Sequence, residues 1–160
     1  MKRIICLLVI ITIFATGCGN KSDVDSHVKA QDIEAIALEK LTSEFGYCDV
    51  SEYYQTNYFN SIDGLVSCKI YTCNDSTNFD ELGIFEFDSV KSAKKAIKDV
   101  KRYLGNAKEE FKSGIIYNVE EYPKFEAARV EAIGNSLVYT ILSPNDSEVI
   151  FSSIAKKQGV

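Results

Sequence analysis

Hydrophobic residues recur at helical spacing in the longest patterned stretch of the chain, residues 88–111. The apolar positions follow one another at alternating steps of three and four: Val90, Ala93, Ile97, Val100, Leu104, Ala107 and Phe111. Such spacing places them on one face of an α-helix, and Asp88 or Ser89 is a suitable N-cap. We therefore predict a long amphipathic helix packed on a sheet, with Gly105 as a point where it bends or splits.

Segments with β-type patterns flank this helix on both sides. Apolar and polar residues alternate over residues 65–73, and residues 81–87 are apolar on both faces, with turn-forming residues 74–80 between them. Residues 127–133 alternate again, and Gly134-Asn135 turns the chain into residues 137–142. We expect two antiparallel hairpins.

Helical patterns also occur at both ends of the domain. Residues 28–45 carry apolar side chains at helical spacing before Gly46, and Ser143-Pro144 is a typical helix start. The tyrosine-rich stretch between residues 47 and 63 has no period, and we predict it to be irregular with at most one helical turn. The order αββαββα predicts an α+β fold, a two-layer sandwich with a mostly antiparallel four-stranded sheet and helices on one face.

The N-terminus has the pattern of an export signal. Lys2 and Arg3 precede residues 4–14, which are apolar except for Thr12. As a helix this stretch rises about 16 Å, roughly half of a membrane's hydrocarbon core. It is therefore too short to span a membrane, and residues 15–18, Ala-Thr-Gly-Cys, resemble a lipobox.

These features predict a chain that is processed and anchored by lipid. We expect residues 1–17 to be a signal peptide and Cys18 to carry a diacylglyceryl group, whose two acyl chains give stable anchoring. Residues 18–27 would form a flexible stalk, and residues 28–160 a single α+β domain. The expected location is the extracytoplasmic face of the cell membrane.

Charge narrows the range of partners. The chain has 18 Lys and Arg against 23 Asp and Glu, a formal net charge of −5. An acidic balance argues against nucleic acid. The predicted long helix is an exception, because one stretch of it is rich in cations: Lys91, Lys94, Lys95, Lys98, Lys101 and Arg102. This face is a candidate contact for anionic headgroups or wall polymers, or else an ordinary solvated helix face.

Three cysteines remain after Cys6 and Cys18 are assigned to the signal and the lipid. Cys68 and Cys73 lie on one predicted strand with opposite orientations, so they cannot bond to each other. A disulfide from Cys48 to either of them is conceivable outside the cytosol, and three reduced thiols are the alternative. Cys48, Cys68 and Cys73 are the candidate residues for a thiol-based redox activity.

Other chemistry is poorly supported. The only histidine, His27, lies at the edge of the stalk, and the sequence has no metal-binding CxxC or HxxxH spacing, so we expect neither a metal nor a cofactor. One loop carries oxygen ligands suited to calcium but lacks the central glycine and regular spacing of a calcium loop: Asn74, Asp75, Asn78, Asp80 and Glu81. The tyrosines from residue 47 to 58 either stack on sugars or peptides or serve for packing.

Several segments together resemble a known family. They are the lipoprotein-like start, the opening helix, Asp-Glu-Leu-Gly-Ile-Phe at residues 80–85, the lysine-rich helix, the connector with Tyr117 and Tyr122-Pro123, and the Gly-Asn turn at 134. Over residues 28–157 the chain resembles a bacterial domain of unknown function catalogued under the number 4358, found mostly in lipoproteins of Gram-positive, low-GC bacteria. The resemblance implies an exported, lipid-anchored α+β domain and supplies no activity or site residues.

Two functional hypotheses follow. The first is a non-enzymatic accessory lipoprotein that binds a partner protein, a peptide or an envelope component at the membrane surface. The alternative is a thiol-based redox or other enzymatic module that uses Cys48, Cys68 or Cys73.

Overall fold

The computed structural model describes residues 29–114 and 118–158. The predicted signal peptide, Cys18, the stalk at 18–27 and Tyr117 lie outside the described residues. Within the described ranges, no helix is long and apolar enough to cross a membrane.

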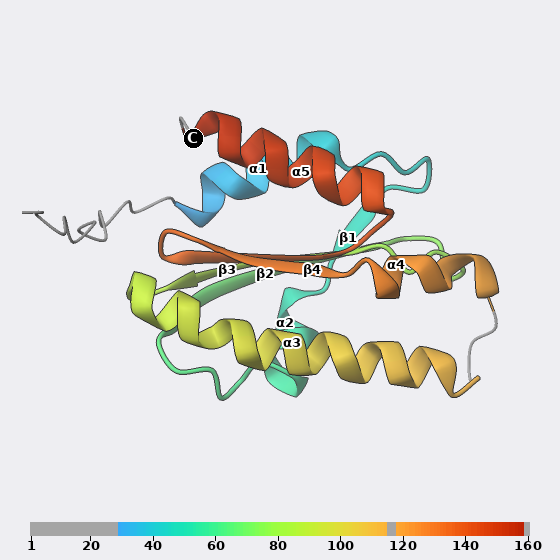
Figure 1. Ribbon diagram of the computed structural model, residues 1–160, viewed down its shortest axis with the longest axis horizontal. Coiled ribbons are helices and arrows are strands. Elements are labelled where there is room, and N and C mark those ends of the chain that lie inside the picture. The colour runs from blue at the N-terminus through green and yellow to red at the C-terminus, as the bar shows by residue number, and fades with distance from the viewer. Residues whose placement is uncertain (1–28, 115–117, 159–160) are drawn as a thin grey trace, which may run out of the picture.

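A single antiparallel sheet organises the domain (Figure 1). Its spatial order is β1-β2-β3-β5-β4, and every neighbouring pair is antiparallel. The strands are β1 (Tyr47–Asp49), β2 (Leu65–Cys73), β3 (Glu81–Phe87), β4 (Arg129–Ile133) and β5 (Ser136–Ile141).

Helices cover both faces of this sheet (Figure 1). On one face lie α1 (Ala30–Lys40) and α5 (Pro144–Lys157), and on the other lie α2 (Ser51–Asn57) and α3 (Val90–Lys112). A short 3₁₀ turn, η1 (Val119–Glu121), leads into α4 (Tyr122–Glu126), which packs beside α3. The domain therefore has three layers.

The structure confirms the α+β class and the antiparallel hairpins, but the predicted two-layer arrangement with helices on one face is wrong. Leu82 and Ile84 of β3 belong to one core, and Phe85 and Phe87 belong to the other. A strand that is apolar on both sides needs cover on both sides, because either uncovered face would leave large hydrophobic side chains in water.

The predicted strand number is also wrong, because the sheet has five strands. The additional strand is β1, which pairs Tyr47 with Cys73 and Asp49 with Tyr71 at the edge of β2. It spans only three residues and exposes one of them, so it is too short to display an alternating pattern.

The long helix is continuous, and its N-terminal prediction is confirmed. Ser89 caps α3 by accepting a hydrogen bond from the Ser92 backbone N–H at 3.2 Å. Gly105 does not split the helix, which runs through it to Lys112. Ser143 caps α5 in the same way, accepting from the Asp146 N–H at 3.1 Å.

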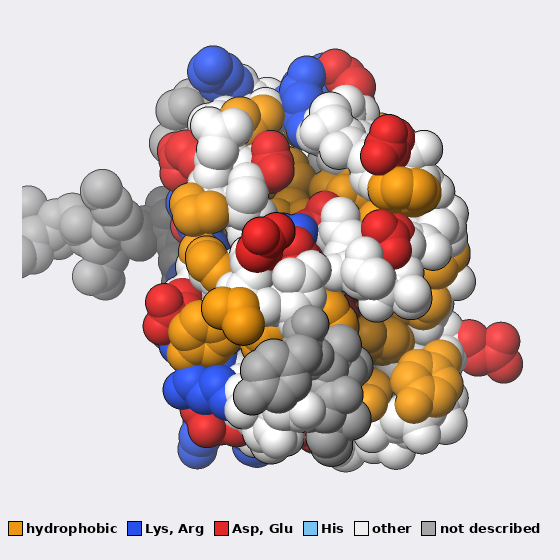
Figure 2. All heavy atoms as spheres, turned by 90° about the vertical axis from the view of Figure 1, so that its right-hand side faces the viewer, with side chains coloured by type: hydrophobic (Ala, Val, Ile, Leu, Met, Phe, Trp, Pro, Cys, Tyr) orange, Lys and Arg blue, Asp and Glu red, His pale blue; other side chains and the backbone are white. Residues whose placement is uncertain are grey.

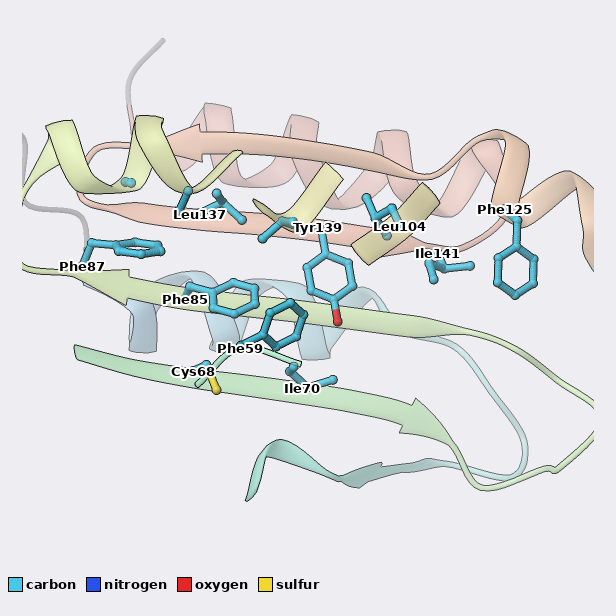
Figure 3. Packing of buried hydrophobic residues seen from close by; sticks show 13 residues of the cluster. Phe59, Cys68, Ile70, Phe85, Phe87, Leu104, Phe125, Leu137, Tyr139 and Ile141 are labelled. Atoms are coloured by element: carbon cyan, nitrogen blue, oxygen red, sulfur yellow. The ribbon is translucent and has the colours of Figure 1, made fainter. Parts of the chain in front are cut away.

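The two cores differ in chemistry. The aliphatic core, under α1 and α5, contains Ile33, Ala37, Leu82, Ile84, Val138, Leu142, Ile150, Phe151 and Ile154. The aromatic core, under α2 and α3, includes the rings of Phe59, Phe85, Phe87, Phe125 and Tyr139 (Figure 3). The aromatic core is the one that contains the candidate site.

Candidate functional site

A cavity of about 570 Å³ lies on the aromatic side of the sheet. Residues of α2, α3, α4 and the β2–β3 connection line it, and the start of β3 contributes Glu81. Figure 2 views the domain from the end where α4 lies, and hydrophobic side chains are visible there in recesses between polar ones. A concave cavity whose surface is mostly apolar and which also carries polar groups is the usual form of a small-molecule site.

Glu81 is the most unusual residue of this cavity. It is a carboxylate with only 6% of its surface exposed. Tyr103 and Tyr139 donate hydrogen bonds to its Oε1 at 2.7 and 2.6 Å, and Tyr54 donates to Oε2 at 2.8 Å. Three elements, α2, α3 and β5, thus converge on the first residue of β3.

Gly83 makes this arrangement sterically feasible. Glu81 and Gly83 lie on the same face of β3, and Gly83 is directly opposite Tyr139 of β5. A Cβ at Gly83 would lie 1.9 Å from Cε1 of Tyr139. Only glycine leaves room for the ring to lie across β3 and bring its hydroxyl to Glu81. Figure 3 shows this ring beside Phe85 and Phe59.

Burial determines the electrostatics of the cluster. Desolvation raises the pKa of Glu81 above its usual range, although the three tyrosine hydroxyls act in the opposite direction. Desolvation, together with the nearby Glu81, also raises the pKa of Tyr54, Tyr103 and Tyr139. The phenols therefore remain protonated and serve as donors.

A second polar cluster joins the β2–β3 connection to α4. Lys124 Nζ lies 2.6 Å from both Asp80 Oδ1 and Glu121 Oε2, and 3.0 Å from Asn78 Oδ1. Tyr47 donates to the other Asp80 oxygen at 2.9 Å. Partial burial lowers the pKa of Lys124, but the bonds with Asp80 and Glu121 outweigh this effect and raise it.

The aromatic walls of the cavity form two groups. Tyr54, Tyr58 and Tyr103 lie together, with ring centroids 5.3 to 6.2 Å apart. Phe79, Phe111 and Phe125 form the second group, with centroids 4.5 to 6.0 Å apart. Two phenols of the first group bind Glu81, whereas the rings of the second group carry no polar atom, so the two groups offer a ligand different contacts.

The tyrosine-rich segment contributes only part of its residues to the cavity. Tyr54 and Tyr58 line it, whereas Tyr53 is 60% exposed and Phe59 is buried in the aromatic core. Tyr47 binds Asp80 in the second polar cluster. Within this segment the rings of Tyr53, Tyr54 and Tyr58 contact one another, whereas Tyr47 serves the second polar cluster.

The acidic loop does not assemble a cation site. Asp75 accepts hydrogen bonds from the backbone N–H and hydroxyl of Thr77, Asp80 binds Lys124, and Glu81 binds the tyrosines. In the part of the chain that the structure describes, no group of His, Cys, Asp and Glu is arranged to hold a metal ion. Asn74 donates to the carbonyl of Phe45, which is a loop contact.

The three candidate redox cysteines are all free thiols. Cys68 is buried in the aromatic core, and burial raises the pKa of its thiol, which lowers its reactivity. Cys73 Sγ lies 3.2 Å from Ser43 Oγ, and Cys48 Sγ lies 3.3 Å from Thr72 Oγ1. Cys48 is opposite Thr72 in the sheet, one position away from Cys73, so their side chains point to opposite faces.

The predicted basic face is present on α3. All six of its cations are exposed: Lys91, Lys94, Lys95, Lys98, Lys101 and Arg102. Lys95 pairs with Asp63 at 2.7 Å and Arg102 pairs with Asp99 at 2.9 Å. Part of this charge is therefore neutralised locally.

Sequence reasoning missed the central role of Glu81. The available signal was an acidic residue at the start of a largely apolar strand, followed two positions later by glycine. Its hydroxyl donors lie 22, 27 and 58 residues away along the chain. No local pattern connects such distant residues.

Comparison with known proteins identifies the family of the chain. No curated protein and no solved structure matches the chain significantly. One family does match, over residues 36–142, and this range includes Glu81, Gly83 and all three tyrosines that bind Glu81. Because the match covers well over half of the 160 residues, the chain belongs to the family described as "Domain of unknown function (DUF4358)".

Proposed function

We propose that this protein is a non-enzymatic binding module, held by a lipid on Cys18 at the extracytoplasmic face of the cell membrane, and that the cavity beside Glu81 is its ligand site. The observation that carries the proposal is the cavity itself. Its volume of about 570 Å³ falls within the range of small-molecule sites, and six of the fourteen described residues that line it are aromatic.

The site residues favour binding over catalysis. General acid–base or nucleophilic chemistry needs a group that can exchange a proton with the substrate. The acid that lines the cavity most deeply, Glu81, is already bound by three phenols whose raised pKa keeps them protonated. Such a cluster is suited to fixing the shape and charge of a site.

The anchor proposal rests on the sequence of residues 1–18. Two cations, a short apolar run and the Ala-Thr-Gly-Cys motif are the parts that lipoprotein processing requires. At the membrane surface, the partners within reach of the domain are envelope proteins and other envelope components.

The ligand site is tested by blocking the cavity rim. Asn106 is an exposed lining residue on α3, so Asn106→Trp adds bulk at the cavity without disturbing a core. Lys101→Trp places the same ring on the exposed side of the same helix and serves as the matched control. The full chain in a non-ionic detergent is screened with a fragment library by saturation-transfer NMR.

We expect a set of fragments whose signals are lost with Asn106→Trp and retained with Lys101→Trp. A library in which no fragment distinguishes the two variants would overturn the assignment of the cavity as a ligand site.

The anchor is tested by metabolic labelling with radioactive palmitate. The full chain should incorporate label, and Cys18→Ser should abolish incorporation because the acceptor sulfur is gone. Cys6→Ser is the matched control, since it removes a cysteine from the predicted signal peptide and should leave labelling intact. Labelling that survives Cys18→Ser would contradict the anchor.

A further inference from the structure

The charge lining the cavity is one-sided. Three acidic residues line it, namely Asp80, Glu81 and Glu110, and no Lys or Arg is among the lining residues that the structure describes. Asp80 has its own counterion in Lys124 at 2.6 Å. The lining of the cavity therefore includes acidic side chains and, among the described residues, no basic ones.

Glu81 lacks a counterion within residues 29–114 and 118–158. Its partners there are three neutral phenols, and none of the ion pairs found in these ranges includes it. A carboxylate has roughly four acceptor positions. Oε1 accepts two hydrogen bonds and Oε2 accepts one, so Oε2 retains an acceptor position.

Burying a carboxylate without a cation is unfavourable, and this cost is what raises the pKa of Glu81; a cation beside it would stabilise its charged form. With an exposed fraction of 6%, Glu81 is nearly removed from solvent, yet it lines the cavity. A positively charged group placed in the cavity would supply the missing charge.

The aromatic rings beside Glu81 favour the same ligand chemistry. Tyr54, Tyr58 and Tyr103 form one wall, and the face of a tyrosine ring attracts ammonium groups. The second group of rings, Phe79, Phe111 and Phe125, offers apolar contact. Charge and rings together define a ligand with one cationic end and one hydrophobic end.

We infer that the cavity binds a small organic cation whose ammonium group lies beside Glu81 and the tyrosine rings and whose apolar body lies against Phe79, Phe111 and Phe125. This inference rests on the proposed function and specifies its ligand class. Glu81 is the residue that selects for positive charge, and the tyrosines fix its carboxylate in place.

The test compares three probes that share one apolar body and differ only in charge. They are phenylpropylamine, phenylpropanol and phenylpropanoate, titrated into the full chain in a non-ionic detergent by isothermal calorimetry. We expect the amine to bind about tenfold more tightly than the alcohol, and the carboxylate to bind more weakly than either.

Two variants locate the selectivity. Glu81→Gln should reduce the affinity for the amine about tenfold because the negative charge is lost, and it should leave the affinity for the neutral alcohol within about twofold. Glu86→Gln removes the same charge from the same strand at a position that does not line the cavity, and it should leave all three affinities unchanged.

Glu110→Gln keeps the test decisive if Glu81→Gln does not fold. Glu110 is an exposed lining residue, so its substitution does not threaten a core, and it should lower the amine affinity about threefold. Equal affinity for amine and alcohol, or preference for the carboxylate, would overturn the cation inference. If fragments still distinguish Asn106→Trp from Lys101→Trp, the ligand site itself stands.

Discussion

The two faces of the central sheet bury different kinds of side chains. The aliphatic face packs α1 and α5 on Leu82, Ile84 and Val138, and it includes a buried hydroxyl pair, Thr140–Ser147, at 2.9 Å. The aromatic face, built on the alternate residues of the same strands, contains the Glu81 cluster and the cavity. One strand, β3, thus carries a packing surface on one side and a candidate site on the other.

This difference suggests a division of roles between residues that are neighbours in sequence. Substitutions on the aliphatic face should lower stability and leave the cavity's binding properties intact. Substitutions at the site should alter charge and shape with smaller costs in stability, apart from Gly83, on which the site geometry depends.

We expect the largest effect from Gly83→Ala. The added methyl group would overlap the Tyr139 ring, which also lies 2.5 Å from it at Cζ, and displacing this ring breaks its bond to Glu81. Overpacking and the lost hydrogen bond together should lower the free energy of unfolding by about 4 kcal/mol, measured by urea denaturation.

Gly105→Ala is the matched control for this prediction. A Cβ there would have nothing within 4 Å, and alanine favours a helix, so the free energy of unfolding should rise by about 0.5–1 kcal/mol. A Gly83→Ala protein as stable as the wild type would show that Tyr139 is not fixed over β3.

Leu82→Ala should have the next largest effect. Leu82 is fully buried in the aliphatic core, and its truncation should lower the free energy of unfolding by about 3 kcal/mol through lost burial and a residual cavity. The affinity for phenylpropylamine, measured by calorimetry, should stay within about twofold of the wild type. A large loss of affinity would show that the two faces are coupled.

Glu81→Gln should have a smaller effect that depends on pH. The pKa of Glu81 is raised in the folded protein, so its contribution to stability is present below the ordinary value of 4.5 and is lost as the pH rises through the folded value. Gln cannot titrate, and it offers one acceptor oxygen instead of two. The variant should therefore be about 1 kcal/mol less stable than the wild type in acid.

The difference in stability between the wild type and Glu81→Gln should shrink or change sign as the pH rises. Urea denaturation midpoints of both proteins, measured at about pH 4 and about pH 8, test this. Glu86→Gln controls for net charge on the same strand. A gap that widens toward high pH would mean that the folded protein stabilises the charged form of Glu81.

The smallest effects concern the two helix caps, one on each face. Ser89→Ala and Ser143→Ala each remove a hydroxyl that accepts a hydrogen bond from the backbone N–H of the third residue of a helix, Ser92 in α3 and Asp146 in α5. Each should lower the free energy of unfolding by about 1 kcal/mol, and the double variant should show the sum because the sites are independent. Unequal losses measured by urea denaturation would show that the helix on one face depends more on its cap than the other.

Local sequence patterns predicted the helices and turns that depend on residues close together in the sequence. The alternating steps of three and four from Val90 to Phe111 identified α3, and Ser89 and Ser143 identified the starts of two helices. Gly134, with φ of 59°, marked the turn between β4 and β5 because glycine adopts this conformation without strain.

Contacts between residues far apart in the sequence could not be predicted from these patterns. Edge strand β1 depends on pairing with β2, and the third layer depends on which side of β3 each helix covers. The two-sided apolar pattern of residues 81–87 did signal cover on both sides, but the order of elements alone does not assign helices to faces. The Glu81 cluster required the register of β3 and β5 and the path of α2.

The ion cluster around Lys124 has a mechanical consequence. Phe79 and Phe125 belong to two separate connections, one between β2 and β3 and the other beyond α3, and Lys124 ties these connections together through Asp80 and Glu121. Glu121 adds a second tie by accepting the backbone N–H of Phe79 at 2.9 Å. Because these bonds join the two connections, they hold Phe79 and Phe125 at a fixed separation, so this part of the cavity keeps its width without a ligand.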